Sequence, residues 1–160
     1  KVSKVFQNLD NAQQIGFELM VMGEIVPDLN YEFSIAYTEG EDLESSTPLP
    51  EIPPLETVLN LRYDIQRLPA WIQLEGRWVQ DQDRISVEYG ESSTEGFSVY
   101  NLKTGMTLFE KVSINVSMNN LLDTAYHEHL SRNFAKNTAD SGLPLYEPGR
   151  NIILNVGLNF

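Results

Sequence analysis

The sequence lacks cysteine, which excludes disulfide bonds and thiolate chemistry. It is also poor in Lys and Arg, with 11 of them against 23 Asp and Glu, for a formal net charge of -12. This charge argues against nucleic acid as a partner, because contacts with phosphate require clusters of Lys and Arg. No run of about 18 apolar residues occurs, which excludes a transmembrane helix. Strand-built membrane proteins escape that exclusion, since their alternating strands have an unremarkable mean hydropathy.

The length of 160 residues suits one domain or a piece of a larger one. The chain begins with Lys1, and residues 1–8 carry no signal-peptide pattern. We therefore expect a fragment or a processed chain.

What the sequence has in abundance is alternation of apolar and polar residues, which predicts β-strands. The alternation is clear in residues 112–119, and again in residues 151–160, where only Ile153 breaks it. No helical periodicity competes with it. We predict an all-β fold, an antiparallel up-and-down meander of about eight strands. The other strands are expected at residues 14–26, 29–38, 55–66, 72–78 and 96–103, with a poorly defined first strand around 2–8.

The predicted connections are of two kinds. Short turns are expected at residues 27–30, 68–70 and 104–105, where Pro, Asp and Gly occur. Long polar loops are expected near 39–53, 80–95 and 119–149. Because alternate connections of a meander lie at the same end, the chain should have a short-turn end and a long-loop end.

Alternation shows that the two faces of the sheet differ, but not which face is inside. A lipocalin-like soluble barrel would enclose the apolar face, whereas a membrane barrel would turn it toward lipid. The expected strand lengths, the loop asymmetry, the charged polar faces and the aromatic residues near strand ends favour the membrane barrel. The charged residues are Glu18, Glu32, Arg62, Asp64, Glu75 and Arg77. The aromatic residues are Tyr31, Tyr37, Tyr63, Trp71, Trp78 and Phe160.

Three stretches of the sequence carry recognisable motifs. The first is an Asn-x-x-x-Ala-x-x-x-Gly-x-Glu strand opening, and the second is a Pro-Leu-x-x-Ile-Pro-Pro segment that returns to the barrel. The third joins an Asn-Leu-x-Asp-x-x-Tyr motif to a Pro-Gly-Arg that opens the last strand, which ends on an aromatic residue. The positions are Asn8, Ala12, Gly16 and Glu18; residues 48–54; and Asn120, Leu121, Asp123, Tyr126, Pro148, Gly149, Arg150 and Phe160. In this order, the three stretches resemble the TonB-dependent outer-membrane receptors.

The resemblance implies that residues 1–160 are the C-terminal portion of a 22-stranded transmembrane β-barrel whose plug domain and earlier strands are absent here. It implies TonB-energised uptake of a scarce nutrient, such as an iron–siderophore or another metal complex, across the outer membrane of a Gram-negative bacterium. The implied partners are the lipid bilayer, the receptor's own plug domain, TonB, and the outer-membrane assembly machinery, which would read Phe160 as a signal. The loops at 39–53, 80–95 and 119–149 would supply substrate-binding residues.

Few residues suggest other chemistry. His127 and His129 are weak candidates for metal ligands, because they would share a face of an extended segment and imidazole suits transition metals. The acidic loops could attract cations to the mouth, although surface solubility is the favoured explanation. No nucleophile elbow, paired-carboxylate site or phosphate-binding Gly loop is present, so we predict no enzyme and no cofactor.

Two other functions stay open at this point. A complete eight-stranded soluble barrel could bind a small apolar ligand, and a small eight-stranded membrane barrel could serve in adhesion or as an enzyme. The order in which the receptor-like motifs occur favours the receptor.

Overall fold

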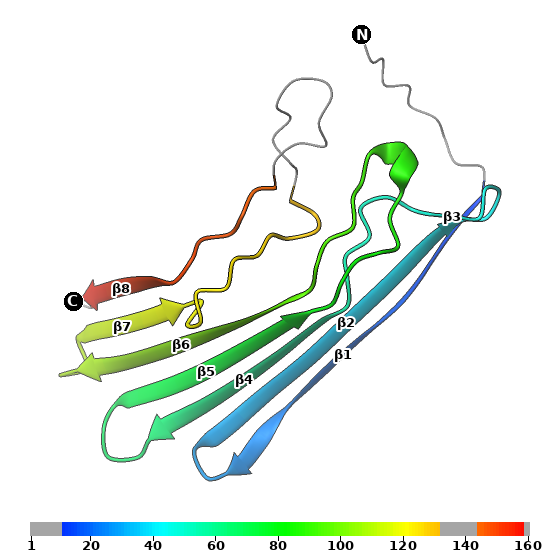
Figure 1. The fold of residues 1–160 in the computed structure, drawn as a ribbon. Helices are drawn as coiled ribbons and strands as arrows, with labels where there is room; N and C mark the ends of the chain where they lie inside the picture. The colour runs from blue at the N-terminus through cyan, green and yellow to red at the C-terminus, as the bar shows by residue number, and fades with distance from the viewer. Residues whose placement is uncertain (1–10, 132–143, 159–160) are drawn as a thin grey trace.

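A computed structural model describes residues 11–131 and 144–158, which form one antiparallel sheet (Figure 1). The strands follow one another across the sheet in chain order, except that the short β3 pairs only with β2. This confirms the predicted all-β meander. The strands are β1 (Ala12–Val26), β2 (Leu29–Asp42), β3 (Thr47–Pro48), β4 (Glu56–Ile65), β5 (Ala70–Val79), β6 (Phe97–Leu108), β7 (Val112–Asn119) and β8 (Asn151–Leu158).

The one helix of the described residues is the 3-10 turn η1 (Val87–Tyr89). No helix in this part of the chain is long and apolar enough to span a membrane. The strand expected around residues 2–8 and the terminal Phe160 lie outside the described residues.

The connections divide between the two ends of the sheet as predicted. The turns after β1, β4 and β6 lie at one end, and the long connections after β2, β5 and β7 lie at the other (Figure 1). Two boundaries, the ends of β2 and β6, differ from the prediction by more than two residues. Strand β2 continues to Asp42, into the predicted loop 39–53, because Gln13 to Ile15 of β1 pair with Gly40 and its neighbours and extend the hairpin.

The predicted turn at Thr104–Gly105 is wrong. Both residues lie inside β6, and the chain reverses instead at Phe109–Lys111. Gly105 is opposite Trp71 of β5, and a Cβ atom on Gly105 would lie 2.7 Å from the indole ring. The glycine therefore makes room for a tryptophan rather than for a change of direction.

The strand register puts the apolar residues of all the long strands on one face. Leu19 is opposite Ile35, Leu61 is opposite Leu74, and the same face continues through β6 and β7 to the last strand. In β8 this face carries Ile152, Leu154, Val156 and Leu158. The opposite face carries polar and charged residues. The alternation seen in the sequence is therefore one continuous apolar face and one continuous polar face.

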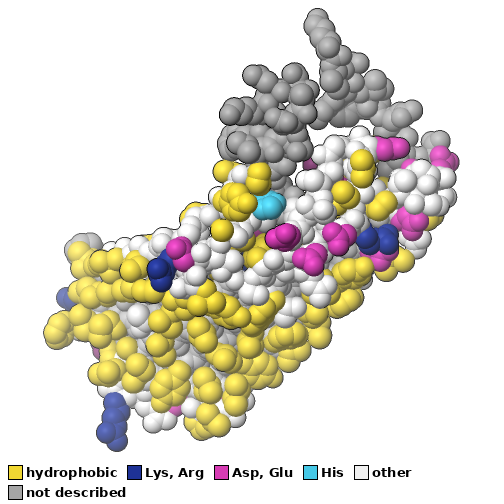
Figure 2. Space-filling view, in the orientation of Figure 1, with side chains coloured by type: hydrophobic (Ala, Val, Ile, Leu, Met, Phe, Trp, Pro, Cys, Tyr) yellow, Lys and Arg dark blue, Asp and Glu magenta, His cyan; other side chains and the backbone are white. Residues whose placement is uncertain are grey.

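This apolar face is exposed rather than packed into a core. Ile15, Leu154 and Val156 are each 60–62% exposed. Figure 2 shows the apolar side chains as a broad band over the strands, with acidic residues beyond it toward the loops. Among the described residues, only Ile52, Val79 and Val99 are buried hydrophobic residues.

The sheet is also open in the described residues, with β1 and β8 at opposite edges. An open sheet with an exposed apolar face does not provide the enclosed apolar interior that a lipocalin-like barrel requires. One of the aromatic residues near the strand ends does not lie on the apolar face. Trp71 lies on the polar face, opposite Asp64 and beneath the guanidinium of Arg62, whose Cζ is 4.3 Å from the ring centroid.

Candidate functional site: the polar face and the loop assembly

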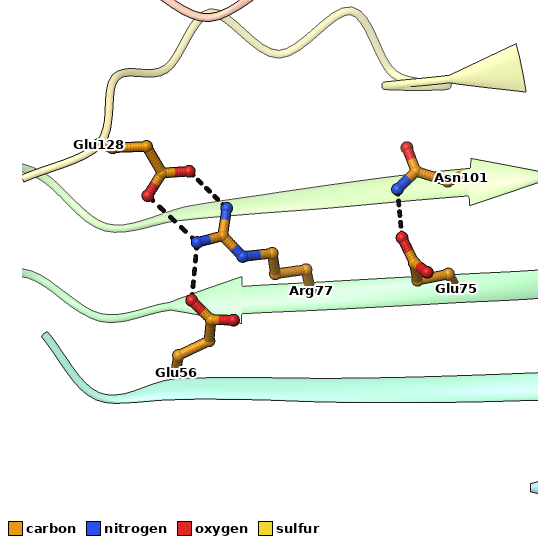
Figure 3. Close-up of polar contacts among 5 residues, drawn as sticks. All are labelled: Glu56, Glu75, Arg77, Asn101 and Glu128. Atoms are coloured by element: carbon orange, nitrogen blue, oxygen red, sulfur yellow. Dashed lines mark hydrogen bonds and ion pairs between the residues drawn. The ribbon is translucent and has the colours of Figure 1, made fainter. Parts of the chain in front are cut away.

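The polar face of the sheet carries an ion cluster centred on Arg77 of β5 (Figure 3). Its guanidinium donates to Glu56 of the neighbouring β4 at 2.6 Å and to both carboxylate oxygens of Glu128 at 2.5 and 3.1 Å. Glu128 comes from the loop after β7, 51 residues further along the chain. The planar fork of arginine suits such a bidentate contact. Arg77 thus fastens a loop to the wall of the sheet.

A second polar group lies next to it along the same strand. Glu75 accepts hydrogen bonds from Asn101 at 2.5 Å and from Lys103 at 2.8 Å, both on β6. Closer to the short turns, Arg62 donates to Asp64 at 2.9 Å. Each cationic side chain on a described strand is therefore paired with a carboxylate, and the remaining carboxylates give this face an acidic excess.

The loops after β2 and β5 lock together at the other end of the sheet. The Gln82 side chain, 7% exposed, donates to the carbonyl oxygen of Ile52 at 2.9 Å. Arg84 lies 2.7 Å from Glu39 of β2. Glu91 accepts from the backbone nitrogens of Glu51 and Ser86, at 2.5 and 2.8 Å. These two loops, together with the loop after β7, form one packed unit. We call it the loop assembly: residues 43–55, 80–96 and 120–131.

The loop after β7 joins the other two loops through His129, while Glu128 holds it to Arg77 of the wall. The Nδ1 atom of His129 lies 3.0 Å from Oγ1 of Thr94. His127 makes an edge contact with Tyr146, with ring centroids 5.6 Å apart. Burial lowers the pKa of His129, which favours the neutral imidazole.

The two histidines lie next to different partners, and in the described ranges no three His, Cys, Asp or Glu side chains gather as a metal-binding group. Metal binding by His127 and His129 stays a prediction. Sequence reasoning selected the three loops but missed their mutual contacts. Of the residues that make them, Ile52 lies in the Pro-Leu-x-x-Ile-Pro-Pro segment, whereas Gln82, Glu91 and Thr94 belong to no recognisable motif. These residues meet only through the fold.

Comparison with known proteins identifies the family. The family model described as "TonB dependent receptor-like, beta-barrel" matches residues 2–121. The chain belongs to this family.

Solved structures of TonB-dependent receptors have the same arrangement of strands. The copper transporter OprC superposes with a TM-score of 0.84 at 26% identity, over 93% of this chain and 24% of that one. The FrpB iron transporter from Neisseria meningitidis gives 0.71 at 19% identity, over 93% and 24% of the two chains. FpvA of P. aeruginosa, bound to a pyoverdine–iron complex, gives 0.69 at 18% identity, over 93% and 20%.

The chain thus spans between a fifth and a quarter of the length of these proteins. A search of curated proteins finds no match.

Within this receptor-family chain, the structure brings the two halves of the third motif together. Asn120 is only 2% exposed; its side chain donates to the carbonyl oxygens of Thr124 at 2.9 Å and Pro148 at 3.4 Å. Asp123 accepts from the backbone nitrogen of Arg150 at 2.7 Å. The Asn-Leu-x-Asp motif therefore holds the Pro-Gly-Arg segment directly before β8 begins.

The tyrosine of the same motif packs against the wall. The Tyr126 ring lies 4.3 Å from that of Phe97, the first residue of β6. Burial raises the pKa of Tyr126, and the nearby carboxylates of Glu128 and Glu147 act in the same direction, so the phenol stays neutral. The motif thus fixes the entry to the last strand by two hydrogen-bonding side chains and one packed ring.

Proposed function

We propose that residues 1–160 are the C-terminal part of a 22-stranded TonB-dependent receptor in the outer membrane of a Gram-negative bacterium. The whole receptor imports a scarce nutrient, an iron–siderophore or another metal complex, with energy supplied through TonB. The missing strands and the plug domain belong to the rest of that protein. Phe160, outside the described residues, acts as the signal read by the outer-membrane assembly machinery.

The observation that carries the proposal is the exposed apolar face. A Leu, Ile or Val side chain gains about 1.5–3 kcal/mol when it leaves water. The side chains on this face forgo that gain as long as water surrounds them. Hydrocarbon supplies an apolar surrounding without a second layer of protein, and a sheet closed by further strands leaves no backbone group unpaired in lipid. The apolar face is therefore the lipid face of the proposed barrel.

The polar face then lines the lumen and meets the plug domain. Charged pairs such as Arg77 with Glu56 suit this setting, because water and polar plug groups solvate them, whereas lipid does not. The loop assembly lies at the end of the strands that carries the long connections, as the extracellular loops of outer-membrane barrels do. We assign substrate capture to these loops.

The class of substrate is supported by the structures that this chain is similar to. Their titles name a copper transporter, an iron transporter, and a receptor bound to a pyoverdine–iron complex. A further one is described as the ferripyoverdine receptor of the outer membrane of Pseudomonas aeruginosa. All of these substrates contain a transition metal. A metal ion or metal chelate is therefore the substrate class that we propose.

The test uses the full-length receptor in an outer membrane that lacks competing receptors. Uptake of radiolabelled copper and of iron–siderophore complexes would be measured in otherwise identical cells with and without functional TonB. We expect at least one metal form to accumulate only when both the receptor and TonB are present. Equal accumulation without TonB, for every metal form tried, would refute the proposal.

A further inference from the structure

The methionines of the chain are divided evenly between the two faces of the sheet. Met106 and Met118 lie on the apolar face, opposite Ile114 and Ile152. Met20 and Met22 of β1 lie on the polar face, opposite Ser34 and Glu32. The first pair is part of the apolar face and needs no further explanation. The second pair is apolar in a polar setting.

The polar-face pair belongs to a regular ladder along β1. Residues two apart in a strand point to the same side, with a spacing of about 6.6 Å. Glu18, Met20, Met22 and Glu24 therefore follow one another on this face, as carboxylate, thioether, thioether and carboxylate. Glu32 of β2 adds a third carboxylate directly across from Met22.

The two thioethers are accessible. Met20 is 60% exposed and Met22 is 65% exposed in the described residues. Ser34, opposite Met20, and Ala36, opposite Glu18, are small, so the neighbouring strand leaves space above the ladder. Methionine has three rotatable side-chain bonds, which allow two sulfur atoms at this spacing to turn toward one ion.

The charges around the pair favour a cation. Arg62, Arg77 and Lys103, the cationic side chains on the described strands, are each within 2.9 Å of a carboxylate other than those of the ladder. Their charge is therefore locally neutralised, and the ladder's carboxylates leave a negative potential along β1.

We propose that Met20 and Met22 form a binding site for a soft monovalent metal ion, Cu(I), on the lumenal wall. Thioether sulfur is a soft ligand that selects Cu(I) over hard cations, while the flanking carboxylates attract positive charge without competing as soft ligands. This inference rests on the proposed function, because it gives the lumen a cargo that would pass along this wall. It names the substrate class as a soft metal ion rather than an anionic iron chelate.

The experiment measures binding of Ag(I), which resembles Cu(I) and needs no reductant, to the purified full-length receptor. The variant M20L/M22L removes both sulfur atoms and keeps two apolar side chains of similar volume. We expect it to bind Ag(I) at least about tenfold more weakly than the wild type, the scale on which disturbing a metal site acts. Binding of Zn(II), a harder ion, should not change.

The matched control is M106L/M118L, which makes the same replacement twice on the apolar face. It should bind Ag(I) as the wild type does. If M20L/M22L also binds Ag(I) like the wild type, or if it weakens Ag(I) and Zn(II) equally, the thioether site is refuted. The first result would assign the two methionines to packing against the plug, since leucine serves that purpose equally well.

A transport measurement distinguishes failure of the methionine site from failure of the proposed transport function. TonB-dependent metal uptake by the wild type, together with unchanged Ag(I) binding in M20L/M22L, would refute the site alone. Methionine-dependent Ag(I) binding in a receptor that takes up no metal with TonB would support the site and refute the transport proposal.

Discussion

The wall of strands and the loop assembly are stabilised in different ways. In the wall, the apolar side chains are exposed and the order comes from backbone pairing, with registers that run unbroken for ten residues between β4 and β5. In the loop assembly and its junction with β8, polar side chains such as Gln82 and Asn120 are buried and hydrogen-bonded. The apolar side chains of the wall therefore lack partners within the described residues, whereas the buried polar side chains of the loop assembly are hydrogen-bonded within it.

Under the proposed function, this difference assigns the two regions to different environments. A surface that leaves its apolar side chains exposed is stable where lipid replaces water. A surface that satisfies its own polar groups is stable in water. Mutations in the wall and mutations in the loop assembly should therefore have different effects on stability.

The largest effect is expected from a charge placed on the apolar face. Leu61 lies mid-strand between Tyr31 and Leu74, so Leu61→Arg would put a guanidinium into hydrocarbon. We expect the free energy of unfolding of the full-length receptor in bilayers to fall by about 2–4 kcal/mol. The adjacent Asn60→Arg places the same group between Glu32 and Glu75 on the polar face, and it should change stability by less than about 1 kcal/mol. Equal losses of stability for Leu61→Arg and Asn60→Arg would contradict the assignment of one face to lipid and the other to the lumen.

A smaller effect is expected from the ion cluster that joins the two regions. Arg77→Met would leave the carboxylates of Glu56 and Glu128 facing each other without a cation. Because these side chains are 39% and 30% exposed, we expect a loss of about 2 kcal/mol rather than the full cost at a buried site. Loop 120–131 should also become more susceptible to protease.

The matched variant for this cluster is Arg84→Met, at a pair whose arginine is 51% exposed. It should cost less than about 1 kcal/mol and leave loop 120–131 protected. If both variants behave alike, Arg77 does not fasten the loop to the wall.

The smallest effect, and of opposite sign, is expected at the turn between β6 and β7. Phe109 and Glu110 have φ of 52° and 59°, which costs ordinary residues about 1 kcal/mol each. Replacing them with Asn and Gly, the residues that this geometry favours, should raise the thermal midpoint of the full-length receptor slightly. The control Arg67→Gly, in a turn where φ is not positive, should not raise it. A gain from the control and none at residues 109–110 would contradict the assigned backbone.

The same turn shows where sequence reasoning failed. Its residues, Phe109, Glu110 and Lys111, include no Gly, Pro or Asn, so nothing in the letters marks a reversal. The nearest turn-like dipeptide, Thr104-Gly105, indicates a reversal in its place, although that glycine accommodates Trp71. The register of the sheet sets where β7 begins, and it outweighs the local turn preference of Thr104-Gly105.

The strands themselves were predictable because alternation is a local property. The polar set of β5, Gln73, Glu75 and Arg77, already stood out in the sequence, and its place on one face follows from a repeat of two. The partners of these residues cannot be predicted from the same pattern. Glu128 lies 51 residues from Arg77, and no pattern in the sequence links the two.

The sequence alone determined that this chain forms a two-faced antiparallel sheet, because side-chain direction in a strand depends only on parity. Its motifs, and not the alternation, carry the resemblance to the TonB-dependent receptors. The tertiary structure decided that the three long loops lock together, that Asn120 and Asp123 hold the start of β8, and that Met20 and Met22 stand among carboxylates. Those contacts join residues far apart in the chain, and only the pairing of whole strands fixes which distant residues meet.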